Sequence, residues 1–144
     1  MAQPHGRAEL LRYGLDWLLA AAILMAMALV LDRFGRSLPP GLATVLPPMF
    51  ASVRAGMRFV SSEKRPLAGR EAWLASLAMT GVVAVLTLLQ LLLFWNSAMI
   101  AEAREVIPGS FLALIALVLL GVVLLVNRLF LGHGIKLGLK RLEE

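Results

Sequence analysis

Long apolar stretches bounded by polar residues dominate the pattern of this chain. Segments 13–32, 73–95 and 107–127 are apolar almost throughout. Each holds about 20 residues, and a helix of that length, rising 1.5 Å per residue, matches the hydrocarbon thickness of a bilayer. The runs are continuous rather than alternating, which favours spanning helices over the strands of a membrane barrel. We predict one membrane span from each segment.

A fourth apolar segment, 38–58, contains two Pro-Pro pairs. Pro39 and Pro40 suit the start of a helix. Pro47 and Pro48 fall inside it, and we expect a kink there, because proline lacks an amide donor and its ring crowds the preceding turn. We predict a Pro-kinked second span, with a re-entrant segment as the alternative.

The first segment has a rival interpretation as a cleavable signal peptide. It has a basic start, an apolar stretch and the triplet Ala26-Met27-Ala28, which has the form of a cleavage site. The apolar run continues through Leu31 without a polar region, and removal would leave an odd number of spans. We therefore favour a retained span.

The amino-acid composition also favours a membrane protein. Hydrophobic residues make up 60% of the 144 residues and charged residues 16%, against about one half and one quarter in soluble domains. A chain this short cannot bury so much apolar surface in its own core. The predicted fold class is all-α: one polytopic membrane domain, residues 1–144, with four transmembrane helices in an antiparallel bundle.

Basic residues are distributed unevenly around these spans. Eleven of the 14 Lys and Arg residues lie in the N-terminal segment, in or beside the loop 59–72, or in the tail 128–144. The excess of Lys and Arg on one side sets orientation, so both termini and this loop are predicted to be cytoplasmic, in a bacterial inner membrane. Anionic lipid, rather than nucleic acid, is the expected partner of the basic residues. The candidate headgroup contacts are Lys64, Arg65, Arg70, Arg128, Lys136, Lys140 and Arg141.

The tail 128–144 has an amphipathic, basic pattern. Its leucines can rest on the membrane surface while its lysines face phosphates. Gly132, Gly134 and Gly138 interrupt the pattern and argue against a firm helix, because glycine is a poor helix former.

Few polar residues fall inside the spans, and Asp16 is the most suggestive of them. A carboxylate facing lipid is costly, but Asp16 lies one turn from Arg12, so we favour an interfacial position or an ion pair with a residue such as Arg58. Arg54 and Arg58 share a helical face at i, i+4 spacing; they either anchor the topology or form part of an anion site. Gln90 either lines a pore or, as we favour, hydrogen-bonds between helices.

Signatures of catalysis are missing from the sequence. It has no cysteine and only two histidines, and no His and carboxylate cluster has metal-ligand spacing. No nucleophile motif or Gly-rich phosphate loop occurs either. We expect no enzymatic activity, no metal and no cofactor.

Residues 57–73, MRFVSSEKRPLAGREAW, are the most distinctive part of the chain. They resemble a family of small, uncharacterised proteobacterial inner-membrane proteins with four predicted helices. The resemblance lies in Arg58-Phe59-Val60, Arg65-Pro66 and Glu71. It implies the four-helix architecture and carries no known activity.

Two functional hypotheses follow. The leading one is a non-enzymatic inner-membrane protein that acts through contacts with other membrane proteins or with itself, as a homo-oligomer. The alternative is a small oligomeric transporter or channel that uses Asp16, in which Asp16 and the Pro47-Pro48 kink line one cavity.

Overall fold

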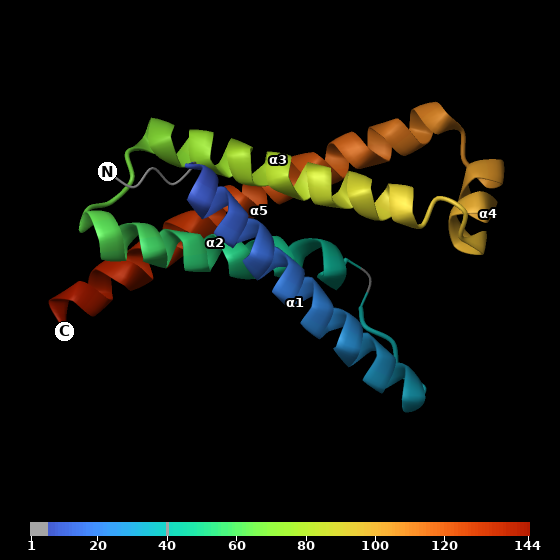
Figure 1. Cartoon of the computed structure of the whole chain (residues 1–144), viewed down its shortest axis with the longest axis horizontal. Helices are drawn as coiled ribbons and strands as arrows, with labels where there is room; N and C mark the ends of the chain where they lie inside the picture. Colours follow the sequence, from blue (N-terminus) through green and yellow to red (C-terminus); the bar gives the residue numbers. More distant parts are fainter. Residues whose placement is uncertain (1–5, 40) are drawn as a thin grey trace.

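Helices make up almost all of the described part of this chain (Figure 1). A computed structural model describes residues 6–39 and 41–144, apart from the side chains of residues 99, 103 and 104. Over these residues there is no strand, which confirms the all-α prediction. The helices are α1 (Arg7–Arg33), α2 (Leu42–Glu63), α3 (Gly69–Leu93), α4 (Ala98–Val106) and α5 (Gly109–Glu143).

Three of these helices are long and apolar enough to cross a membrane: α1, α3 and α5. They contain the predicted segments 13–32, 73–95 (to residue 93) and 107–127 (from residue 109). The described part of α2 does not meet the same test of apolarity. Its second half carries Arg54 and Arg58 and its buried residues include Ser52, so its sequence is less apolar than that of its neighbours.

The segment 38–58 differs from expectation at its start. The α2 helix begins at Leu42, after Gly41 with a φ of 88°, whereas we placed the helix start at Pro39 and Pro40. Gly41 explains the later start, because glycine adopts this left-handed conformation without steric cost. Pro40 itself lies outside the described residues. Pro47 and Pro48 are buried inside α2, which is helical throughout its bounds.

The loops are shorter than the pattern suggested. Only residues 64–68 separate α2 from α3, because both helices extend into the loop 59–72. The short helix α4 occupies most of the connection between α3 and α5, in the stretch that the pattern leaves between the predicted spans 73–95 and 107–127. In the first turn of α3, Glu71 accepts a hydrogen bond from the Ala68 N–H at 3.1 Å, which satisfies one of the free donors of the helix start.

The tail is where the sequence-based expectation was wrong. Residues 128–143 form the second part of one continuous helix, α5, despite the three glycines. Two of these glycines face α2: a Cβ on Gly134 would lie 2.8 Å from Val53 Cα, and one on Gly138 would lie 2.9 Å from Val60 Cβ. The missing side chains therefore allow a close helix–helix contact, and that contact offsets the poor helix propensity of glycine.

Packing is concentrated at one end of the molecule. All the buried residues of the described chain lie in what we call the packed end, which is formed by residues 7–24, 47–63, 69–83 and 123–143. Away from it α1 diverges from α3 and α5, so that residues 25–33, 84–93, α4 and 109–122 form a splayed end (Figure 1). The helices α1 and α2 run antiparallel, while α2 and the end of α5 run parallel.

The contact between α2 and α5 is the most extensive in the molecule. On α2, a Cβ on Gly56 would lie 2.6 Å from the Leu131 carbonyl oxygen and 2.9 Å from the Ile135 nitrogen. Together with Gly134 and Gly138, this glycine lets the two backbones touch. Close approach of this kind is how helices associate in lipid, where burying apolar surface gives no net gain.

Candidate functional site

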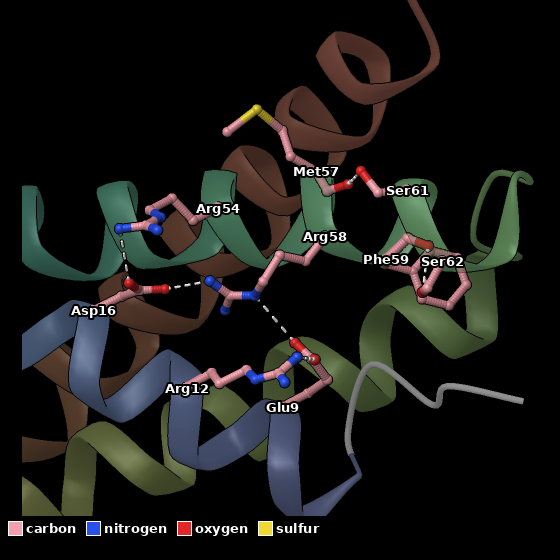
Figure 2. A network of polar contacts seen from close by, with 9 residues as sticks. All are labelled: Glu9, Arg12, Asp16, Arg54, Met57, Arg58, Phe59, Ser61 and Ser62. Atoms are coloured by element: carbon pink, nitrogen blue, oxygen red, sulfur yellow. Dashed lines mark hydrogen bonds and ion pairs between the residues drawn. The ribbon is translucent and has the colours of Figure 1, made fainter. Parts of the chain in front are cut away.

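A network of charged side chains joins α1 to α2 at the packed end (Figure 2). Asp16 is only 8% exposed. Its Oδ1 lies 3.1 Å from Arg54 Nη1, and its Oδ2 accepts a hydrogen bond of 2.5 Å from Arg58 Nη1. Arg58 Nε donates to Glu9 Oε2 at 3.2 Å, and Arg12 Nη1 donates to Glu9 Oε1 at 2.8 Å. The predicted ion pair of Asp16 with Arg58 is confirmed, and Arg54 joins it.

Helical spacing creates this network. Glu9 and Asp16 are seven residues apart and therefore lie two turns apart on one face of α1. Arg54 and Arg58 lie one turn apart on the facing side of α2. Because the two helices run antiparallel, the order of the carboxylates matches the reversed order of the guanidinium groups. Asp16 is thereby held as a paired carboxylate by two cations.

An open groove of about 530 Å³ lies over this network. It is bounded by α1, the second half of α2 and the last turns of α5. Its lining includes four arginines and one carboxylate: Glu9, Arg12, Arg54, Arg58 and Arg141, beside Met57, Ser61 and Ser62. Arg58 Nη2 is buried and has no hydrogen-bond partner among the described residues. The groove is therefore a basic site with an unused donor in its wall.

A second polar cluster is centred on Asn127, which is fully buried together with Tyr13 and Ser52. Asn127 Oδ1 accepts hydrogen bonds from the Tyr13 hydroxyl at 2.8 Å and from Ser52 Oγ at 2.7 Å, and Nδ2 donates to Thr80 Oγ1 at 3.1 Å. One amide thus connects α1, α2, α3 and α5. No local signal reveals this cluster, because its members come from four distant segments.

The loop between α2 and α3 is closed by its own ion pair. Arg65 donates to both Glu71 carboxylate oxygens, at 2.9 and 3.2 Å, and stacks 5.2 Å from the centre of the Phe59 ring. The hydrogen bond with Glu71 raises the pKa of Arg65, and this residue stays charged. Arg65, Pro66 and Glu71, quoted above for the resemblance, therefore lie together where the loop meets the start of α3.

The other predicted headgroup contacts are spread over the packed end. Arg128 lies over the Trp73 ring, 5.5 Å from its centre, and this contact holds α5 against the start of α3. Arg141 lines the groove over the charged network, which we call the arginine groove because Arg12, Arg54 and Arg58 line it too. The remaining four are exposed on the surface: Lys64, Arg70, Lys136 and Lys140.

A wedge of about 640 Å³ opens between α1, α3 and α5 toward the splayed end. Most of its lining is apolar, and small side chains are frequent in it: Ala21, Ala28, Ala43, Ala84 and Ala116. Thr44, Thr87 and Gln90 are its polar members. Gln90 is exposed there, and the described residues provide no hydrogen bond to its side chain. Asp16, Pro47 and Pro48 line neither the wedge nor the groove over the charged network, so neither opening is the single cavity that the transporter hypothesis requires.

Comparison with models of known protein families, with curated proteins and with solved structures finds no match to this chain.

Proposed function

We propose that this protein is a four-span, non-enzymatic protein of a bacterial inner membrane, with both termini cytoplasmic. It acts by helix–helix contact within the bilayer, and a second copy of the chain occupies the wedge between α1, α3 and α5. The observation that carries this proposal is Gln90, an exposed amide without a described side-chain partner in a mostly apolar opening.

The second crossing is assigned to α2. Its 22 residues extend about 33 Å, enough for a hydrocarbon core of about 30 Å. Eight of its residues are buried by the other helices, so it needs less apolarity than a helix surrounded by lipid. A bend at Pro47 and Pro48, beside the wedge, belongs to the same proposal.

The orientation rests on the charge distribution. The packed end gathers the N-terminus of α1, the loop 64–68 and the C-terminus of α5, and with them most of the basic residues. Under the positive-inside rule this end is cytoplasmic. Labelling of single cysteines from outside the cell tests it: Ser37→Cys should react with an impermeant maleimide and Ser62→Cys should not. The reverse result contradicts the orientation.

A helix fills the wedge better than lipid tails do. Alanines in the lining let another backbone approach closely, which is the usual contact between helices in membranes. A lipid chain offers no partner to the Gln90 amide, whereas a helix with a polar side chain at the same depth does. The large exposed side chains that surround the wedge include Met25, Leu88 and Leu91, and they add apolar contact.

A second copy is the occupant that supplies a matching group at the same depth. The glutamine amide is both a donor and an acceptor. Two copies related by a two-fold axis bring the same residue together, so each Gln90 would satisfy the other. This is the simplest solution for an unpaired amide in an apolar span.

Cysteine crosslinking in native membranes tests the proposal, and the chain has no cysteine of its own to interfere. Thr87→Cys and Leu91→Cys lie in the wedge, whereas Val85→Cys and Leu89→Cys are exposed on α3 outside it. Oxidation should crosslink the first pair and leave the second pair monomeric. Combining Leu91→Cys with Gln90→Leu should weaken association about fivefold, because one interhelical hydrogen bond contributes roughly 1 kcal/mol; Gln90→Asn should restore part of it.

Equal crosslinking at all four positions would indicate random collision and contradict the proposal. Crosslinking at none of them would exclude a second copy and leave lipid or another protein in the wedge. Substrate-dependent proton flux in proteoliposomes that a folded Asp16→Asn variant abolishes would instead favour the transporter hypothesis.

A further inference from the structure

We infer that the arginine groove binds the phosphate of an anionic phospholipid headgroup, with Arg12, Arg54 and Arg141 as its ligands and Arg58 as the fixed cation behind them. This inference goes beyond the proposed function, because it concerns a different part of the molecule. It depends on the proposed orientation only for the leaflet in which the lipid lies.

The charge balance of the groove favours an anion. Four guanidinium groups, from Arg12, Arg54, Arg58 and Arg141, face two carboxylates, from Glu9 and Asp16. The network therefore keeps a net charge of about two positive units, since arginine is always protonated. A bound anion would offset the mutual repulsion of these charges, which come from three helices.

The donors in the groove are available to a phosphate. Arg141 makes no hydrogen bond or ion pair to the described residues, and Arg12 contacts only Glu9. Arg58 Nη2 is buried, so Arg58 contributes positive charge from behind the wall and leaves hydrogen bonding to the more exposed arginines. Guanidinium groups bind phosphate oxygens in a planar, two-point manner. A phosphate at this wall would satisfy donors that the protein leaves free.

The serines of the groove do not compete for this role. Ser61 Oγ donates to the Met57 carbonyl at 2.9 Å, and Ser62 Oγ donates to the Phe59 carbonyl at 3.0 Å (Figure 2). Their hydroxyl protons are thus committed to the backbone of α2. Binding should therefore depend on the arginines and follow charge.

Apolar surface beside the groove distinguishes a lipid from a free anion. Leu11 is 70% exposed and Leu15 is 66% exposed, and both lie on α1 next to the turn that carries Arg12. A phospholipid places its phosphate among basic residues and its acyl chains along such leucines. Basic pockets between helices at the cytoplasmic side of a membrane are typical headgroup sites.

Native mass spectrometry of the full chain in neutral detergent tests this inference, with dioleoylphosphatidylglycerol as the probe and dioleoylphosphatidylcholine as the zwitterionic comparison. The wild type should retain one phosphatidylglycerol in preference to phosphatidylcholine. The double variant Arg12→Gln/Arg141→Gln should weaken that retention by roughly tenfold or more, because each basic residue near the headgroup contributes on the order of fivefold. Neither residue bonds to Asp16, so the ion pairs of Asp16 stay intact.

The matched control is Arg33→Gln/Arg36→Gln, which removes the same charge from exposed positions outside the groove. It should change retention by less than about twofold. Equal losses in the two double variants would show nonspecific charge attraction and overturn the site. Displacement of the lipid by millimolar inorganic phosphate would identify a soluble anion as the ligand and overturn the lipid assignment. These outcomes are independent of cysteine crosslinking at the wedge.

Discussion

The packed end and the splayed end of this protein use the same kind of helix in opposite ways. At the packed end, glycine, alanine, serine and buried asparagine bring α1, α2, α3 and α5 into contact. At the splayed end, large apolar side chains point outward: Leu29, Val30, Leu92, Leu93 and Phe111 are all exposed. Helices in lipid gain little by burying apolar surface, so small residues and hydrogen bonds decide where they meet. The two ends are therefore a packed framework and a surface open to lipid or to another helix.

The largest effect should follow from breaking the closest contact of the packed end. A Cβ on Gly134 would lie within 3 Å of the Val53 backbone, which cannot move as a side chain can. Gly134→Ala should therefore force α2 and α5 apart and lower the free energy of unfolding by about 3 kcal/mol. Titration with SDS in mixed micelles measures this free energy.

Gly121→Ala is the matched control, because nothing lies within 4 Å of a Cβ at that position of the same helix. It should leave stability unchanged or raise it slightly, since alanine is the better helix former. Similar losses in both variants would show that the close approach of α2 and α5 has no special role.

The two arginines that face Asp16 should contribute unequally to the free energy of unfolding, and both contributions should be smaller than that of Gly134. The Arg58 side chain is 25% exposed and contacts two carboxylates, whereas that of Arg54 is 45% exposed and contacts one. Arg58→Gln should lower the free energy of unfolding by about 2 kcal/mol, because it leaves a buried carboxylate with one exposed partner. Arg54→Gln should cost less than about 1 kcal/mol, as exposed pairs do. The same SDS titration measures both, and equal costs would contradict the idea that burial sets the contribution of each pair.

An effect no larger than that of Arg58→Gln should come from the buried amide. Asn127→Ala removes the shared partner of the Tyr13 and Ser52 hydroxyls and should lower the free energy of unfolding by about 1 to 2 kcal/mol, because interhelical hydrogen bonds in membranes are individually weak. Asn96→Ala, at an exposed position beyond α3, is the control and should be neutral. A neutral Asn127→Ala would mean that the cluster adds specificity without stability.

Part of the candidate site was predictable because it depends on spacing along single helices. The i, i+4 pair Arg54 and Arg58, and the preference of a buried Asp16 for a basic partner, follow from helical geometry and from the cost of an unpaired charge in lipid. The convergence of Tyr13, Ser52, Thr80 and Asn127 did not follow, because the pattern within one segment does not say which of its polar residues meets those of another segment. Gln90 was expected to bond between helices, but its partner is not among the described residues.

The sequence by itself determined that the chain forms long helices, and it indicated that lipid surrounds them. Apolar runs of spanning length require helices, since lipid offers no partners to a free backbone. Only the tertiary structure decided how the helices meet. The glycines of the tail weaken a helix when considered alone, yet Gly134 and Gly138 let α5 pack against α2 along that very stretch. Helix propensity is a local property of the chain, whereas the effect of a glycine on packing depends on the residue that it faces on the neighbouring helix.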